Sequence, residues 1–163
     1  RLWVSYLDGS LLRIEGDEVT TLFPVGSAQT LSIAETSDAR VWVATSSDGI
    51  YSYSGDERTH YLHQPDRTDS PLPTNALTAL LVEDGSKIWV STRDHGLLSW
   101  RDGAFHPVPL DAPHTKNIRL SRVLRTGGLL FRSSDGQFNV YESENQLLHT
   151  PFFNVSNFGL YLL

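Results

Sequence analysis

The sequence predicts an all-β protein built from repeated small antiparallel sheets, and three observations lead to this prediction. Four segments of similar sequence recur along the 163 residues, and their aligned glycines are 40, 47 and 40 residues apart. The segments are rich in Val, Ile, Trp and Tyr, which favour β-strands. No long segment places its apolar residues at the 3.6-residue period of an amphipathic helix.

Each repeat is predicted to form a strand, a tight turn and a second strand. Asp-Gly occupies three of the turns and His95-Gly96 the other, and such pairs supply the positive φ angles that tight hairpin turns require. The four repeats align over residues 2–11, 41–51, 88–97 and 129–138.

Further strands extend each repeat on both sides. A second turn follows each repeat, at residues 15–17, 54–56, 101–103 and 142–144. An additional apolar strand precedes three of the repeats, at residues 30–34, 77–82 and 118–124. The complete unit therefore has four short antiparallel strands.

Four-stranded units of this length are typical of the blades of a β-propeller. Because blades pack face to face, their central strands should be apolar on both faces instead of alternating. Residues 41–43 and 88–90 have this character. We therefore expect Trp3, Trp42 and Trp89 to pack between blades, and we prefer this interpretation to a ligand cage.

The third repeat resembles the two-component regulator propeller repeat. In residues 75–100 an apolar strand ends in Glu-Asp, a turn leads to Ile-Trp-Val-Ser-Thr at 88–92, and Gly-Leu at 96–97 precedes Trp100 by three residues. The family pattern has the same order of apolar strand, turn, Ile-Trp-Ile-Gly-Thr, Gly-Leu and aromatic residue. The resemblance covers nearly the whole chain and is weakest in the fourth repeat.

The second repeat matches the same pattern through residues 41–45, Gly49 and Tyr53. Ala44 and Ser91 stand where the family usually has glycine, so a small residue is kept. Other propeller types fit less well, because the chain has no Trp-Asp pair of the WD40 kind, no Ser-x-Asp-x-Gly box and no complete kelch pattern.

The resemblance implies a function as well as a fold. Members of that family form extracytoplasmic sensory domains of bacterial histidine kinases, hybrid two-component systems or diguanylate cyclases. For this chain it implies a periplasmic sensory, ligand-binding domain of an inner-membrane receptor, with any catalytic output domain outside the chain. A streptogramin-lyase-like propeller enzyme and a structural scaffold for dimerisation are the alternatives.

Composition narrows the possible partners. The chain carries 13 basic and 19 acidic residues, for a net charge of -6, and the basic residues form no visible cluster. Binding to nucleic acid is therefore not expected. The absence of cysteine suits an oxidising compartment such as the periplasm, and suits the cytosol nearly as well. We expect no cofactor, and the ligand, whether small molecule, glycan or protein, is left open.

We interpret the chain as a single β-propeller region over residues 1–163. About four blades are expected, belonging to a ring of seven or eight; a closed ring of four blades is the alternative, because both ends together could complete one blade. Further blades of the same receptor, or a second copy, would cover the apolar end faces. The expected units are residues 1–28, 29–74, 75–115, 116–150 and the first strand of a further blade at 151–163.

No catalytic or metal-binding residue is predicted. His60 and His63 have the spacing of a metal pair, but residues three apart on a strand face opposite ways, and no carboxylates accompany them at ligand spacing. We expect both to be ordinary histidines of strands and loops.

The candidate contact residues lie at the longest irregular segment, residues 60–74, which accounts for the 47-residue spacing. Insertions in repeat proteins map to one face, often the binding face. The hairpin turn at 93–95 should open on that same face. We therefore predict that Tyr61, Arg67, Arg93 and His95 contact a ligand or partner; a solvated loop without a partner is the alternative.

Overall fold

The computed structural model describes residues 1–6, 10–22, 28–55, 57–110, 117–124, 128–134, 136, 138–142 and 146–152. Every regular element in these residues is a β-strand, and the strands form four antiparallel sheets. The prediction of an all-β protein is confirmed. Among the described residues no helix could span a membrane. Of the strand predicted at 151–163, residues 151 and 152 end the last strand of the fourth sheet instead of starting a further blade, and residues 153–163 lie outside the described residues, as does the Asp8-Gly9 turn.

Each sheet contains strands that follow one another along the chain. The first contains β1 (Leu2–Ser5), β2 (Leu11–Glu15) and β3 (Glu18–Leu22). The second contains β4 (Thr30–Glu35), β5 (Val41–Thr45), β6 (Ile50–Ser54) and β7 (Glu57–Tyr61). The third contains β8 (Leu77–Glu83), β9 (Lys87–Thr92), β10 (Leu97–Arg101) and β11 (Ala104–Pro107). The fourth contains β12 (Arg119–Val123), β13 (Leu129–Arg132), β14 (Phe138–Glu142) and β15 (Gln146–Phe152).

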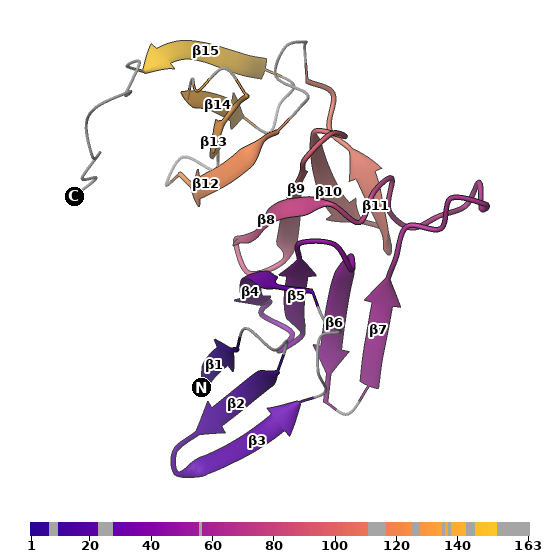
Figure 1. The fold of residues 1–163 in the computed structure, drawn as a ribbon. Helices are drawn as coiled ribbons and strands as arrows, with labels where there is room; N and C mark the ends of the chain where they lie inside the picture. The colour runs from indigo at the N-terminus through magenta and orange to yellow at the C-terminus, as the bar shows by residue number, and fades with distance from the viewer. Residues whose placement is uncertain are drawn as a thin grey trace.

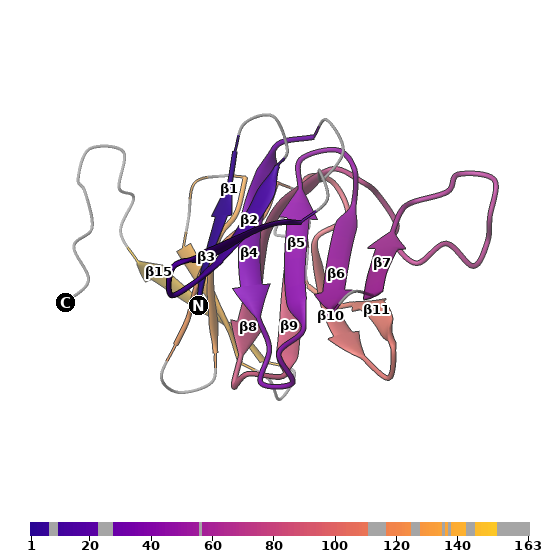
Figure 2. The same ribbon diagram turned by 90° about the horizontal axis from the view of Figure 1, so that it is seen from below.

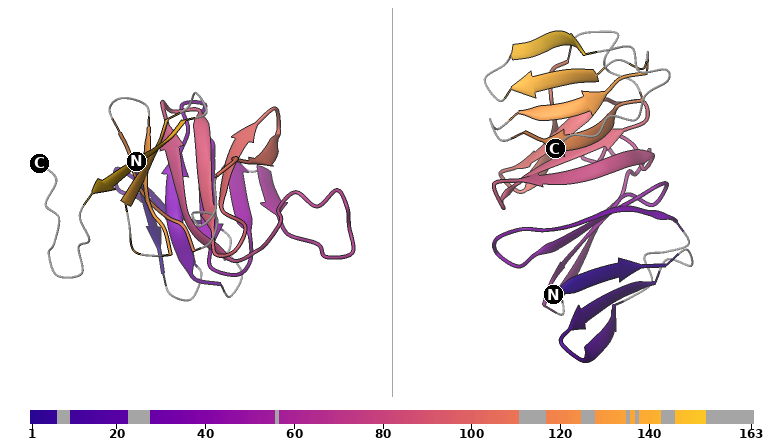
Figure 3. Two further views of the ribbon diagram at one scale, coloured as in Figure 1. Left: turned by 90° about the horizontal axis from the view of Figure 1, so that it is seen from above. Right: turned by 90° about the vertical axis from the view of Figure 1, so that its left-hand side faces the viewer.

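The four sheets radiate as a fan from the edge formed by β1, β4, β8 and β12 (Figure 1). The second, third and fourth sheets touch through these inner strands, since β4 contacts β8 and β8 contacts β12. The first sheet packs on the second through a cluster that includes Leu11 and Trp3. The first and fourth sheets lie at opposite ends of the stack (Figure 3). The described strands are therefore arranged as propeller blades in an arc, and they do not close into a ring of four.

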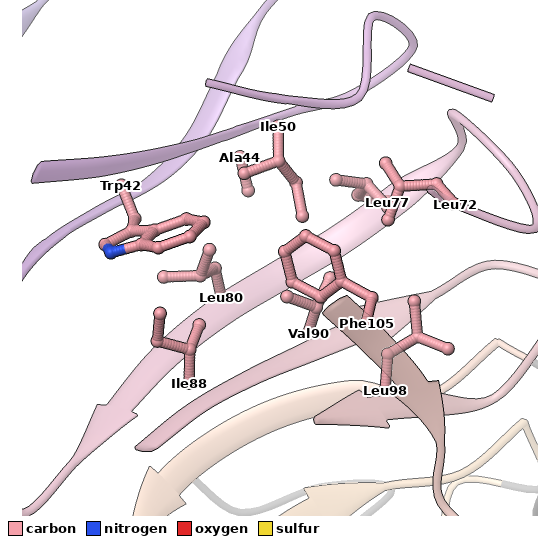
Figure 4. Packing of buried hydrophobic residues seen from close by; sticks show 10 residues of the cluster. All are labelled: Trp42, Ala44, Ile50, Leu72, Leu77, Leu80, Ile88, Val90, Leu98 and Phe105. Carbon is pink, nitrogen blue, oxygen red and sulfur yellow. The ribbon is translucent and has the colours of Figure 1, made fainter. Parts of the chain in front are cut away.

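The core lies between the sheets, as the apolar central strands predicted. Along β5, side chains alternate between two interfaces: Val41 and Val43 pack toward the first sheet, while Trp42 and Ala44 pack toward the third. Figure 4 shows the cluster between the second and third sheets. Trp3, Trp42 and Trp89 each belong to or pack against one of the three inter-sheet clusters, which confirms their predicted packing role.

The turns and loops that connect the strands lie at two opposite ends of the sheets, and each candidate site lies at one of these ends. The turns between β5 and β6 and between β9 and β10 lie at the end that also carries residues 62–76; we call this the loop end. It is the upper end in Figure 2, where the segment after β7 projects to the right. The turns between β4 and β5, β8 and β9, and β10 and β11 lie at the opposite end.

Glycine is required at the turn between β5 and β6. Gly49 has a φ of 68°, and a Cβ added there would overlap the carbonyl oxygen of Tyr61. Gly55 has a similar φ of 57° but open space around it. The first turn is therefore limited by conformation and by a close approach of two backbones, whereas the second is limited by conformation alone.

These two glycines give a matched test of the blade geometry. We expect Gly55→Ala to lower the free energy of unfolding by about 1–2 kcal/mol, the cost of a left-handed conformation for an L-residue. Gly49→Ala should cost more, because its methyl group also overlaps a carbonyl of β7. Urea denaturation of both variants would measure the difference. Equal losses would show that the approach to Tyr61 is not tight.

Buried tyrosines between the first and second sheets predict alkaline sensitivity. Burial raises the pKa of Tyr53, whose hydroxyl is buried without a hydrogen-bond partner. Because the unfolded chain then loses this proton at lower pH than the folded chain, the free energy of unfolding should fall as pH rises above about 10. Tyr53→Phe should flatten this decline and should not lower the stability at neutral pH. Tyr6→Phe, at an exposed position, should leave the decline unchanged. Unfolding curves from about pH 8 to 11 would measure it.

Candidate functional site

Residues 62–76 form an anchored loop at the loop end. His63 Nδ1 lies 2.9 Å from the carbonyl oxygen of Leu72, and the His63 N–H donates to Asn75 Oδ1 at 2.6 Å. Leu72 is 1% exposed and belongs to the core between the second and third sheets. The loop is thus held by its own polar contacts and by one apolar anchor.

Three of the four predicted contact residues have exposed side chains at this loop end. Arg67 is exposed and forms an ion pair with Asp69 at 2.5 Å. Arg93 is exposed, and its backbone N–H donates to the Ala76 carbonyl at 2.9 Å, which places the 93–96 turn beside the end of the loop. His95 Nδ1 lies 2.9 Å from Asp94 Oδ1. Each of the three side chains is solvent-accessible, and two of them already have an acidic neighbour.

Tyr61 has a different environment from the other three. Its ring stacks on Trp42 with centroids 5.6 Å apart and meets Trp100 and Phe105 edge to face at 5.2 and 5.5 Å. These four rings come from β5 and β7 of the second sheet and from β10 and β11 of the third. Tyr61 is therefore an inter-blade packing residue, and the structure does not group its side chain with Arg67, Arg93 and His95.

Tyr61 does, however, line a pocket of about 530 Å³ between the second and third sheets. Trp42 and Trp100 supply its other aromatic walls, and the turns of the opposite end supply its polar rim. The Ser37 N–H donates to the Gly85 carbonyl at 2.6 Å, so the two rim turns are joined directly. The polar lining residues are Thr36, Ser37, Asp38, Arg40 and Ser86.

Trp42 is the unusual residue of this pocket. It is 2% exposed, and its Nε1–H is buried with no hydrogen-bond partner. A buried donor without an acceptor costs about 1–3 kcal/mol. The two equivalent tryptophans avoid this cost: Trp89 Nε1 donates to Glu83 Oε2 at 2.7 Å, and Trp3 Nε1 donates to Glu35 Oε2 at 3.0 Å.

The pairing register explains why Trp42 has no acceptor of the Glu83 kind. Glu83 lies opposite Lys87 in the β8–β9 hairpin, and Lys87 precedes Trp89 by two residues. The corresponding position opposite Arg40 is Thr36, whose N–H donates to the Arg40 carbonyl at 2.9 Å. The shorter Thr36 side chain contacts Asp38 Oδ1 at 2.5 Å and the Arg40 carbonyl oxygen at 2.9 Å. The carboxylate of one repeat is thus replaced by a hydroxyl that is already bonded elsewhere.

A second hollow, of about 480 Å³, lies at the loop end of the fourth sheet. Arg119 and Arg132 line it together with Asn117. The Asn117 N–H donates to the Arg93 carbonyl at 2.5 Å, so this hollow adjoins the predicted residue Arg93. Sequence reasoning missed Arg119 and Arg132, because they lie in different strands and only the sheet brings them together.

Among the described residues no group of three His, Cys, Asp or Glu side chains could hold a metal ion. His60 stacks on Tyr51 with centroids 4.0 Å apart, and its Nε2 lies 2.8 Å from the Asp48 carbonyl oxygen. His63 contacts Leu72 instead. The two histidines of the candidate metal pair therefore have separate neighbours.

Comparison with known proteins identifies the fold. No family model matches the chain, and no curated protein matches it. Among solved structures, the extracellular domain of a putative one-component system from B. thetaiotaomicron superposes with a TM-score of 0.62 at 19% identity, over 90% of this chain and 20% of that chain. The fold is thus shared with part of that extracellular domain, and the chain spans about a fifth of its length.

Two further structures are more distant. Both are extracellular domains of putative hybrid two-component systems from the same organism, with TM-scores of 0.47 and 0.35 and identities of 16% and 14%. They cover 90% and 91% of this chain and 27% and 26% of their own. Their similarity is too low to add to the argument.

The contrast between Trp42 and Trp89 is open to a direct test. Trp89→Phe should lower the free energy of unfolding by about 1–3 kcal/mol more than the lost contact area explains, because buried Glu83 loses the indole donor and keeps only its ion pair with Lys87 at 3.4 Å. Trp42→Phe removes a donor that has no partner, so its loss should be smaller. Urea denaturation of both variants measures the difference, and a larger loss for Trp42→Phe would contradict the assignment.

Proposed function

We propose that this chain is a sensory, ligand-binding part of the extracytoplasmic region of a bacterial signal-transduction receptor. The observation that carries the proposal is the fan of propeller blades, which superposes on an extracellular domain of a putative one-component system. The resemblance of residues 75–100 to the two-component regulator propeller repeat supports the same function independently.

The proposed location is the periplasm, in a receptor of the inner membrane. An absence of thiols is compatible with that oxidising compartment, and the chain contains no cysteine. Any catalytic output is placed outside this chain, in a part of the receptor that responds to it.

The proposed partners are of two kinds. At the loop end, Arg67, Arg93 and His95 are accessible to a small molecule, glycan or protein ligand. At the ends of the stack, further blades of the same receptor or a second copy would cover the outer sheet faces. The first sheet exposes Leu2, Tyr6 and Val19, each more than half accessible to solvent, which supports such covering.

Cysteine labelling in intact cells tests the extracytoplasmic assignment. Because the chain has no cysteine, Arg67→Cys in the full-length protein of its host gives this region a single thiol at an exposed site. We expect a membrane-impermeant maleimide to label it in cells whose outer membrane has been permeabilised. Ser52→Cys, at a fully buried position, is the matched control and should stay unlabelled.

The opposite result has a clear meaning. If Arg67→Cys is labelled only after the inner membrane is lysed, the domain is cytoplasmic and the proposed receptor topology is wrong. A label on Ser52→Cys in intact cells would show that the blades are not folded, so it also serves as a check on the variant.

A further inference from the structure

The internal repeat supplies a comparison within one molecule. Trp3, Trp42 and Trp89 occupy the same repeat position and face the same way, each toward the next sheet. Two of them donate their indole N–H to a glutamate carboxylate. The third, Trp42, has no partner and lines the pocket of about 530 Å³. A missing acceptor and a hollow therefore coincide at one of the three interfaces.

We propose that this inter-blade pocket binds a small organic carboxylate whose oxygen accepts the Trp42 Nε1–H, as the Glu83 carboxylate does for Trp89. The ligand would supply the acceptor that Thr36 is too short to provide. The inference deepens the proposed function and rests on it for the statement that binding is sensory. The pocket itself is argued from the contacts of this chain alone.

A carboxylate fits the charged rim better than a cation does. At the equivalent interface Lys87 lies 3.4 Å from Glu83, with its Nζ 4.4 Å from the Trp89 ring centroid. Arg40 occupies the position that corresponds to Lys87, and it lines the pocket. A basic group therefore lies near the indole N–H that has no acceptor. Arg40 is bonded to the Ser52 hydroxyl at 3.3 Å and lies 3.9 Å from Asp38, two contacts that a carboxylate could replace.

Asp38 is the acidic residue of the lining, and it is an ionised group whose repulsion of an anion must be offset by solvent and by Arg40. Its side chain is 67% exposed, so solvent screens it. The Thr36 hydroxyl and the Arg40 N–H both contact the same oxygen, Oδ1, at 2.5 and 3.3 Å. These contacts lower its pKa, with the Thr36 hydrogen bond as the largest cause. Asp38 is therefore an anion at the rim that is hydrogen-bonded by Thr36 and Arg40. Arg40 is the basic group that faces both Asp38 and the ligand.

The aromatic walls define the rest of the ligand. Tyr61 and Trp100 are only partly buried and present ring surface to the pocket. A planar or apolar body can pack on them, while the hydroxyls of Ser37 and Ser86 lie at the polar rim. The indicated ligand class is thus a carboxylate attached to a small flat group.

Binding requires a small local movement. The Trp42 nitrogen is covered in the present conformation, so an acceptor reaches it only after a neighbouring side chain moves. Arg40 is the longest polar side chain of the lining, and its side chain is one third exposed, at 33%. Arg40 contacts Ser52, which lies opposite Trp42 in the β5–β6 pairing, so the movement that the proposal requires is that Arg40 leaves Ser52 and turns toward the incoming carboxylate.

The experiment uses this chain, labelled with ¹⁵N, and two probes of the same shape. Phenylacetate carries the carboxylate, and phenylacetamide is its neutral counterpart. The chain has four tryptophans, so four indole N–H signals are expected, and Trp42→Phe identifies the one of interest. We expect phenylacetate to shift the Trp42 signal selectively and to bind at least tenfold more tightly than phenylacetamide.

Two variants at one position complete the test. Thr36→Glu places a carboxylate where Glu83 stands in the next repeat, and we expect it to abolish the shift by occupying the site. Thr36→Val removes the hydroxyl without adding an acceptor, and binding should persist. Thermal unfolding of both variants checks that the blades are intact.

Three results would overturn the inference. They are an unshifted Trp42 signal with phenylacetate, equal binding of the amide, and undiminished binding by folded Thr36→Glu. Each of these would leave the extracytoplasmic assignment intact, because that assignment is decided by thiol labelling in cells. If Arg67→Cys is labelled only from the cytoplasm while phenylacetate binds selectively, the proposed receptor function is wrong and the carboxylate site is still supported.

Discussion

The structure depends on face-to-face packing of apolar side chains between successive sheets. A single central strand serves two cores, because neighbouring residues of a strand point to opposite faces. Val41 and Val43 of β5 pack on one side, and Trp42 and Ala44 on the other. The second and third sheets are therefore stabilised by a neighbour on each side and the first and fourth by one neighbour, and no sheet of the described stack has a core of its own.

The same packing creates the chemical requirement at each interface. A tryptophan placed between two sheets buries a large apolar ring, and its indole N–H must then find an acceptor without water. Glu83 and Glu35 provide that acceptor for Trp89 and Trp3. Where the repeat has Thr36 instead, the donor is left unpaired beside the pocket of about 530 Å³. A hollow of about 390 Å³ also adjoins Trp89, so the unpaired donor, and not the space, distinguishes the Trp42 interface.

The candidate residues illustrate what linear order can and cannot reveal. Connectivity alone places Arg67, Arg93 and His95 at one end of the blades, and the Arg93–Ala76 hydrogen bond puts the turn beside the loop. Tyr61 belongs to the same segment, but its ring turns into the core, because Trp42, Trp100 and Phe105 surround it. The order of residues gives the end of the sheet that a residue occupies; the side-chain direction depends on neighbours from the next blade.

The sequence by itself determined the blades, because strand pairing within a blade is local: apolar runs, positive-φ glycines such as Gly49 and the spacing of the repeats are all read along the chain. Tertiary structure decided the sites. The pocket of Trp42 needs Ser86 and Trp100 from another sheet, and the Arg119–Arg132 hollow needs two strands in register. Contacts between sheets join residues far apart in sequence, and each depends on how a whole blade face packs on the next.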